Sequence, residues 1–381
     1  MARKVAIAGV GLSGLDPAHN STPFGLNALA SRLALADAGL ERSDVDGFAS
    51  AGLGVLQPLE VAEYMGLRPR WIDSTGVGGA TWEVMAAHAT DAIAQGHADV
   101  VLLSYGSTAR SDLRAKLRTA SLDWGSRGPQ QYEVPYGVSL ISKYAMAARR
   151  HMHQYGTTLE QLAEIAVSAR ANAALNPEAA YRDPITINDV LSGPMIADPF
   201  QKLQCCIRSD GGAAVVLVAE ERIADLRKPP VWVLGTGEYG SHVSISQWPD
   251  FTVSPAAESG KLAFERAGVR RSEIDVCALY DAFTYMLLIT LEDLGFCAKG
   301  EGGPFVADGK LRLGGSLPTN TDGGGLSACH PGMRGLFLIV EAVRQLRGEC
   351  TGRQVADAKL ACVSGTGGWF CSSGTMILGR D

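Results

Sequence analysis

The segment AGLERSDVD at residues 38–46 returns, with substitutions, as AGVRRSEID at residues 267–275. In each copy an amphipathic stretch stops at a glycine, a short charged turn follows, and a strand begins at the Val or Ile that precedes an Asp. Residues 24–38 carry apolar side chains at helical spacing before Gly39, and glycine is favoured just past the end of a helix. The segment therefore predicts the same helix, turn and strand twice.

A second, weaker pair supports a duplication. Residues 91–96 are similar to residues 341–348, and each is followed by an apolar strand, at 100–103 and 360–363. Two related pairs in the same order indicate tandem copies of one α/β unit, with a sheet covered by helices on both faces. We predict an N-terminal half at 1–227, with a loop domain inserted at about 107–200, and a C-terminal half at 228–381.

Composition narrows the function. The chain has 381 residues, 46% of them hydrophobic and only 19% charged, with a net charge of −6. This balance argues against a nucleic-acid-binding or polybasic membrane-binding surface, and no apolar run approaches the roughly 18 residues of a membrane span. The eight cysteines form no CxxC pair, and the first residues lack a signal peptide, so we expect a cytoplasmic protein without a disulfide scaffold or a metal site.

One glycine motif needs separate treatment. GVGLSG at residues 9–14 matches the dinucleotide-binding pattern GxGxxG and follows a predicted strand. A helix should begin within that motif, however, and residues 16–21 form a loop pattern instead. We interpret the motif as a glycine-rich strand end.

Three residues are candidates for chemistry. His330 lies in the glycine-dense turn GGGLSACHPG before a predicted helix, where little packing surrounds it, which favours a catalytic role over a core histidine. Tyr280 ends a strand of the second copy, where functional groups are common; a core tyrosine with a solvated hydroxyl is the alternative. Cys362 precedes another glycine-rich turn and could exchange a proton with a ligand; a buried structural cysteine is the alternative.

These motifs carry a family resemblance over nearly the whole chain. DGGAA at 210–214 enters a strand, YDAF at 280–283 stands where thiolases carry an NEAF or HDCF box, CHP at 329–331 replaces their GHP, and residues 362–368 match their last glycine-rich box. The chain resembles the lipid-transfer-protein, or sterol-carrier, type of the thiolase superfamily. The resemblance implies a duplicated, five-layered α/β/α/β/α thiolase fold, a homodimer, and coenzyme A thioester substrates with no further cofactor.

The departure from thiolases is informative. A thiolase needs a nucleophilic cysteine at the start of a helix, where the helix dipole lowers the pKa of the thiol. That position falls at or beside Gly79, and no cysteine precedes Cys205. Without the nucleophile, covalent acyl transfer of the thiolase kind is not expected. Stabilisation of a thioester enolate would still serve retro-aldol cleavage of a β-hydroxyacyl thioester.

Nucleophile-free relatives of this type are aldolases of steroid side-chain degradation. The resemblance makes Tyr280 the proton-transfer group for the β-hydroxyl, His330 an oxyanion donor or second acid–base group, and Cys362 a proton donor to the enolate carbon. Asp281, Gly79 and Gly367 are the expected substrate contacts. A free phenol titrates near pH 10, so a Tyr280 phenolate at neutral pH would need about 4 kcal/mol of help from its surroundings.

The leading hypothesis is thus a carbon–carbon lyase that cleaves a bulky β-hydroxyacyl-CoA, such as a 17-hydroxy steroid side-chain thioester, to a ketone and propionyl-CoA. An acyltransferase or condensing enzyme and a non-catalytic lipid or acyl-CoA carrier are the alternatives. The resemblance also implies a small partner with a zinc ribbon and an OB-fold, forming a heterotetramer on a thiolase-like dimer. Candidates for the CoA phosphates are the basic residues Arg110, Arg114, Lys116, Arg118 and Lys143.

Overall fold

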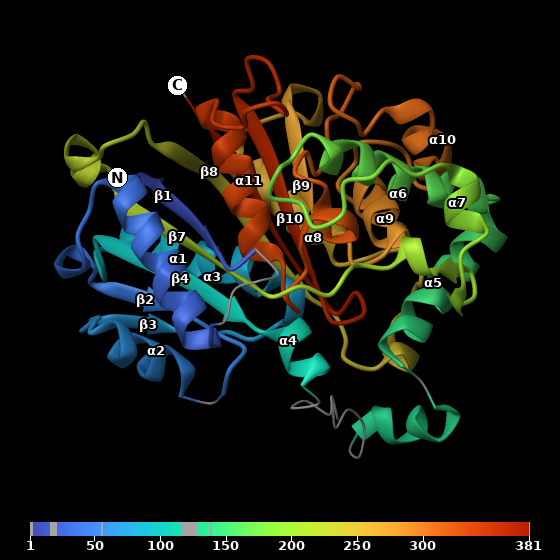
Figure 1. The fold of residues 1–381 in the computed structure, drawn as a ribbon, viewed down its shortest axis with the longest axis horizontal. Helices are drawn as coiled ribbons and strands as arrows, with labels where there is room; N and C mark the ends of the chain where they lie inside the picture. Colours follow the sequence, from blue (N-terminus) through green and yellow to red (C-terminus); the bar gives the residue numbers. More distant parts are fainter. Residues whose placement is uncertain (1–2, 16–20, 55, 116–127, 138, 381) are drawn as a thin grey trace.

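The structure is a computed structural model, and it describes residues 3–15, 21–54, 56–115, 128–137 and 139–380. Its described strands form a mixed sheet in the order β3-β2-β4-β7-β1-β8-β11-β10-β9, shown in Figure 1. The strands of this sheet are β1 (Val5–Ser13), β2 (Gly47–Ala49), β3 (Trp71–Asp73), β4 (Val100–Ser107), β7 (Gly211–Ala219), β8 (Val231–Gly240), β9 (Val276–Leu279), β10 (Leu360–Gly367) and β11 (Ser372–Gly379). The short strands β5 (Met195–Ala197) and β6 (Phe200–Gln201) pair separately.

The helices include four long ones that pack on the large sheet: α1 (Pro23–Ala38), α3 (Thr81–Ala94), α8 (Ala256–Ala267) and α11 (Gly335–Arg347). Between β4 and β7 lie α4 (Ala109–Arg114), α5 (Leu140–Tyr155), α6 (Leu159–Ala174) and α7 (Ile187–Leu191). The others are α2 (Gln57–Met65), α9 (Thr284–Asp293) and α10 (Gly302–Val306).

The topology repeats the duplicated sequence signal. From β1 outward the order β1-β7-β4-β2 matches β8-β11-β10-β9 in the other direction. Helix α1 ends at Gly39 with φ 80°, and α8 ends at Gly268 with φ 65°, both in the left-handed region that favours glycine. Each is followed by a short helical turn and a strand, β2 or β9. The predicted helix–turn–strand units are therefore present in both copies.

Paired glycines seat one helix on each half of the sheet. A Cβ added to Gly9 would lie 2.8 Å from the nitrogen of Ala38, and one added to Gly11 would lie 2.6 Å from that of Ala34. On β8, Gly235 and Gly237 meet the backbone of α8 in the same way. Glycine allows this close approach of helix and strand. The GxGxxG match thus serves packing, as its sequence context indicated.

The layers agree with the thiolase fold. Helix α1 covers β1, β7 and β4, and α8 covers β8 and β11, while α3 and α11 lie between the halves and contact strands of both. The result is the expected α/β/α/β/α order. One detail differs from two separate sheets, because β1 and β8 pair antiparallel at Ala6–Trp232 and Ile7–Val231 and join the two half-sheets edge to edge.

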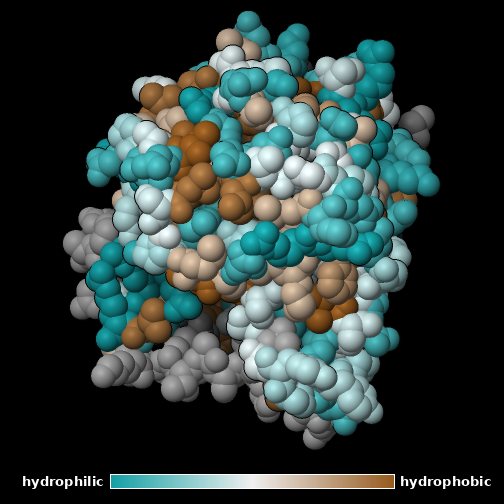
Figure 2. All heavy atoms as spheres, turned by 90° about the vertical axis from the view of Figure 1, so that its right-hand side faces the viewer, coloured by the Kyte–Doolittle hydropathy of each residue, from teal (hydrophilic) through white to brown (hydrophobic). Residues whose placement is uncertain are grey.

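The inserted helices lie against the C-terminal half of the chain. In Figure 1, α5, α6 and α7 sit beside α9 and α10, and α6 contacts both of these helices. On the face that carries them, hydrophobic residues form small separate groups among hydrophilic ones, as Figure 2 shows. The exact limits of the predicted halves and of the loop domain stay predictions. Among the described residues, no helix has the length and apolar character that crossing a membrane requires.

Candidate functional site

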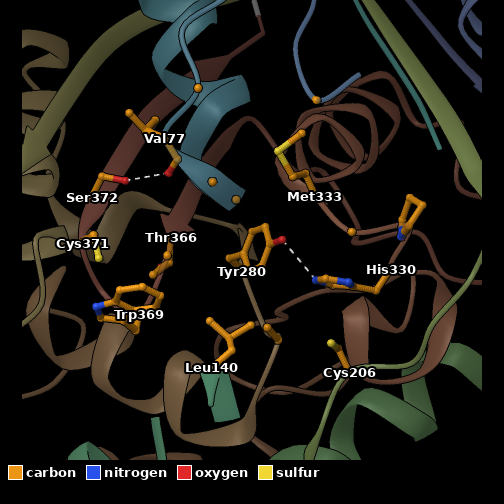
Figure 3. Close-up of a pocket in the computed structure, with 18 of the residues that line it drawn as sticks. Val77, Leu140, Cys206, Tyr280, His330, Met333, Thr366, Trp369, Cys371 and Ser372 are labelled. Carbon is orange, nitrogen blue, oxygen red and sulfur yellow. Dashed lines mark hydrogen bonds between the residues drawn. The ribbon is translucent and has the colours of Figure 1, made fainter. Parts of the chain in front are cut away.

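A cavity of about 860 Å³ opens where the carboxyl ends of β4, β9 and β10 meet the turn before α11. Strand ends of this kind are the usual place for ligands in α/β folds. The wall is mostly apolar, and no Lys or Arg side chain belongs to its described lining. Figure 3 draws Val77, Leu140, Met333 and Trp369 around Tyr280 and His330. The volume and character suit the apolar part of a large substrate.

Tyr280 and His330 form a hydrogen-bonded pair in this cavity. The Tyr280 hydroxyl lies 3.1 Å from His330 Nε2, as the dashed line in Figure 3 marks, and the two rings meet edge to face. The backbone N–H of Arg334 donates to the same hydroxyl oxygen at 3.1 Å. Because this oxygen already accepts one hydrogen bond, its own hydrogen is available to His330 Nε2.

The pair is electrically neutral at rest. Burial and, as a smaller effect, the positive charge of Arg334 together lower the pKa of His330 to about 4. Burial also raises the pKa of Tyr280 well above its ordinary value, although the Arg334 N–H works in the opposite direction. At neutral pH, therefore, an unprotonated imidazole faces a protonated phenol, and this arrangement suits a proton relay better than a standing phenolate.

The ring of Tyr280 fills the space in which a nucleophile would stand. A Cβ added to Gly79 would lie 2.5 Å from Tyr280 Cζ and 2.6 Å from Cε2, closer than such atoms approach, and 2.4 Å from the carbonyl oxygen of Thr366, so the ring and the β10 backbone both exclude a side chain there. Gly79 itself lines the cavity, and its contact with the substrate stays a prediction. Gly367 does not line the cavity, although its neighbours Thr366 and Gly368 do.

Two predicted site residues lie elsewhere. The Asp281 carboxylate is buried outside the cavity lining and accepts hydrogen bonds from the backbone N–H groups of Gly325, at 2.7 Å, and Leu326, at 3.3 Å. It holds the turn that leads to His330, so the expected substrate contact is corrected to a structural one. Cys362 is fully buried inside β10, opposite Cys277 and Ile377, and does not line the cavity either. This position removes the basis for Cys362 as a proton donor.

The sequence analysis missed Arg334. Its guanidinium is fully buried and pairs with Asp322 and, at 3.7 Å, with Asp281, while Nη1 donates to the carbonyl of Cys329 at 3.0 Å. Arg334 thereby ties together both segments that carry the Tyr280–His330 pair. Its place four residues after His330 was the only signal in the sequence.

The predicted phosphate contacts divide into three groups. Lys143 is buried, pairs with Glu133 at 2.9 Å and lies 3.5 Å above the ring of Trp369, so it is corrected to a structural cation. Lys116 and Arg118 lie outside the described residues. Arg110 and Arg114, on α4, stay candidates.

The Arg334→Met variant is expected to lose about 3–5 kcal/mol of unfolding free energy, because it leaves Asp322 and Asp281 buried without their cation. Urea unfolding of the variant and of the unaltered protein measures the difference. Arg270→Met is the control, since Arg270 pairs with Glu273 in solvent and its loss should change the unfolding free energy little. Equal stability of Arg334→Met and the unaltered protein would contradict this role.

Comparisons with known proteins agree with this geometry. Residues 237–380 match the family model of the thiolase C-terminal domain. A steroid side-chain-cleaving aldolase of Thermomonospora curvata is 36% identical over 99% of this chain and 98% of its own. The 17-hydroxy-3-oxo-4-pregnene-20-carboxyl-CoA lyase of Mycobacterium tuberculosis is 33% identical over 96% and 97%.

A solved structure titled Ltp2-ChsH2(DUF35) aldolase superposes with a TM-score of 0.88 at 34% identity, covering 99% of this chain and 98% of that one. The similarity therefore extends over both halves and the inserted segment. Fold, site and relatives lead to one assignment. The chain belongs to the thiolase superfamily, in its sterol-carrier-type, lipid-transfer-protein subgroup that lacks the nucleophilic cysteine.

Proposed function

We propose that this protein is a carbon–carbon lyase that cleaves a β-hydroxyacyl-CoA thioester by a retro-aldol reaction. The observation that carries the proposal is the neutral Tyr280–His330 pair in an apolar cavity, with the Tyr280 ring on Gly79. The substrate we propose is a 17-hydroxy steroid with a CoA-activated side chain, cleaved to a 17-ketone and propionyl-CoA. The relatives named above for steroid side-chain cleavage support this choice of acyl group.

The first step is a proton relay. As the β-hydroxyl proton of the substrate passes to the Tyr280 oxygen, the Tyr280 proton passes to His330 Nε2. The carbon–carbon bond between the α- and β-carbons then breaks, its electron pair forms the thioester enolate, and the β-carbon becomes the ketone. The negative charge of the enolate stabilises the imidazolium that forms on His330. Tyr280 therefore does not have to be ionised before the substrate binds.

The second step returns the proton. His330 gives it back through Tyr280 to the α-carbon of the enolate, which yields the short acyl-CoA and restores the starting pair. The turns at 76–79 and 366–368 pack against each other through their backbones and contribute to the cavity lining. We assign backbone N–H groups of these turns as the hydrogen-bond donors to the thioester oxygen. The Tyr280–His330 pair thus serves as base and acid in turn, and Cys362 is not needed.

The cysteines that line the cavity favour this reaction over acyl transfer. Burial raises the pKa of Cys206 to about 12 and that of Cys371 to about 11, so both remain thiols at neutral pH. Thiolates, rather than thiols, are the nucleophiles of covalent catalysis. Neither cysteine stands at the start of α3, where the family carries its nucleophile.

We further propose a heteromeric assembly, with a zinc-ribbon and OB-fold partner on a homodimer of this chain. The solved relative whose title names two components supports a partner. The described cavity lining contains no Lys or Arg that could bind the CoA phosphates. Residues outside the lining would therefore have to bind them. A single, fully active homodimer after purification would contradict the need for the partner.

The test is incubation of the protein, with and without the partner, with a 17-hydroxy steroid side-chain CoA thioester. We expect propionyl-CoA, the 17-ketone and an unmodified protein mass, all measured by mass spectrometry. The matched control substrate lacks the 17-hydroxyl and should not be cleaved, because it offers no proton to the relay. An acylated protein would indicate the acyltransferase instead, and binding without turnover would indicate the carrier.

A further inference from the structure

Glu83 is a buried acid that the proposed reaction does not use. It lies in the first turn of α3 and is 1% exposed. Within the part of the chain that the structure describes, neither of its carboxylate oxygens has a hydrogen-bond partner. Buried carboxyl groups are usually paired, so the position needs an explanation.

Three glycines make room for this side chain. A Cβ added to Gly335, at the start of α11, would lie 2.5 Å from Glu83 Oε2, and one added to Gly365, on β10, would overlap the same oxygen. A Cβ on Gly374, on β11, would lie 2.8 Å from Glu83 Cβ. None of the three has a positive φ, so the backbone does not require glycine there. The same Cβ atoms would also come within 3.0 Å of backbone atoms at Gly79, Ala80 and Val84, so the three glycines admit both the start of α3 and the Glu83 side chain.

Glu83 is linked to the Tyr280–His330 pair through the residues on two of its sides. One helical turn separates Glu83 from Gly79, against which the Tyr280 ring packs. On its other side, the residue before Gly335 is Arg334, whose N–H donates to the Tyr280 hydroxyl. In Figure 3, Val77, just before this helix, and Tyr280 face the same space.

Few charged groups meet Glu83 in these surroundings. From the end of β9 comes Tyr280, and from the start of α11 comes Arg334, whose guanidinium is taken by Asp322 and Asp281. Neither Gly365 on β10 nor Gly374 on β11 brings a titratable side chain to it. An ionised Glu83 raises the pKa of Tyr280, as the nearby Cys206 and, on β4, Tyr105 also do.

We propose that Glu83 is a pH-sensitive group that stays protonated while the lyase works, and that its ionisation stops the proton relay through Tyr280. This inference rests on the proposed function. The uncharged acid leaves the relay undisturbed. A carboxylate in the same place would oppose both the deprotonation of Tyr280 and the negative charge of the enolate.

The direction of the pH effect follows from burial. Burial raises the pKa of Glu83 to about 8, so the group is neutral below that pH and charged above it. The ionised form would raise the pKa of Tyr280, adding to the larger effect of burial. Activity should therefore fall as the pH rises through about 8. A separate loss of activity is expected at acidic pH, where His330 becomes protonated near its pKa of about 4.

The pH profile of kcat/KM for the full complex tests this inference. In the unaltered protein we expect a fall of about tenfold per pH unit on the alkaline side. Glu83→Gln, which has the same shape without the charge, should remove this fall and leave the acidic one in place. Glu83→Met should do the same, and Glu83→Asp should retain the alkaline fall. Asp91→Asn, a charge change on the exposed face of α3, is the control and should leave both limbs as they are.

A second measurement does not depend on turnover. Infrared difference spectra between the unaltered protein and Glu83→Gln should contain the carbonyl stretch of a protonated carboxylic acid, which disappears with a midpoint near the alkaline limb. Absence of this band at neutral pH, or an alkaline limb that persists in Glu83→Gln, would overturn the inference. A protein that has the band but cleaves no steroid thioester would contradict the proposed function and leave the protonated Glu83 in place.

Discussion

Tyr280→Phe is expected to lower the rate of thioester cleavage by about 10²–10⁴-fold, the usual contribution of a positioned proton-transfer group. The variant keeps the ring that packs on Gly79 and removes only the hydroxyl between His330 and the Arg334 N–H. Substrate binding should change little, so the loss should appear in kcat. Steady-state release of propionyl-CoA measures it.

Tyr285→Phe is the matched control for this experiment. Tyr285 is also buried and close in sequence, but its hydroxyl donates to the carbonyl of Phe251 and it does not line the cavity. It should fold and keep nearly full activity. If Tyr280→Phe turned over like the unaltered protein, Tyr280 would not transfer the proton, and His330 would have to act on the substrate directly.

Gly79→Cys is expected to abolish lyase activity without creating a thiolase. The new Cβ would overlap the Tyr280 ring and the carbonyl oxygen of Thr366, so the ring, the end of β10 or the start of α3 must move, and the relay geometry is lost. The loss should therefore be about as large as that of Tyr280→Phe, near the 10²–10⁴-fold typical of such groups. Intact-protein mass after incubation with acyl-CoA should remain unmodified.

A double variant separates steric exclusion from missing chemistry. Gly79→Cys combined with Tyr280→Asn removes the overlap with the ring at the start of α3, where the helix end lowers the pKa of a cysteine, but the Thr366 carbonyl oxygen still lies 2.4 Å from the added Cβ. We expect the double variant to become acylated only as far as the backbone at Thr366 shifts, and the single variant, which keeps both overlaps, to stay unmodified. Gly54→Ala, at a glycine with no atom within 4 Å of its added Cβ, is the packing control and should retain activity. Acylation of the single Gly79→Cys variant would contradict the steric argument.

The extent of the helices was predictable because their signals are local. Apolar spacing and a terminal glycine placed a helix at 24–38, where α1 spans Pro23–Ala38 and ends at the left-handed Gly39. These signals involve residues within a few turns of one another, so no distant contact is needed to interpret them.

The strand predicted at 360–363 is too short, because β10 spans Leu360–Gly367. This error placed Cys362 at a strand end. The glycine-rich stretch after residue 363 has the composition of a turn, yet β10 continues to Gly367 because β11 pairs with it through Gly365–Gly374 and Gly367–Ser372. Cys362 therefore lies within the strand and not at its end. Glycine in a strand often marks close backbone approach, and here the approach is that of Glu83 and Val77.

Asp281 was misassigned for a different reason. Successive residues of extended backbone direct their side chains to opposite sides. Tyr280 faces the cavity, so Asp281, its neighbour, points away and binds the turn at Gly325 and Leu326. The motif identified the right segment, but only one of its two polar side chains can reach the ligand.

By itself the sequence determined the duplicated α/β architecture and the absence of a nucleophilic cysteine before residue 205, and it predicted Tyr280 and His330 as reactive groups. These are properties of residue types and short-range patterns. Only the tertiary structure decided that the Tyr280 ring occupies the nucleophile's space, that Arg334 supplies the N–H to its hydroxyl, and that Glu83 is buried unpaired among the described residues. Those relations join segments 50 to 250 residues apart, roughly, and their distances depend on how whole layers pack, which no local pattern encodes.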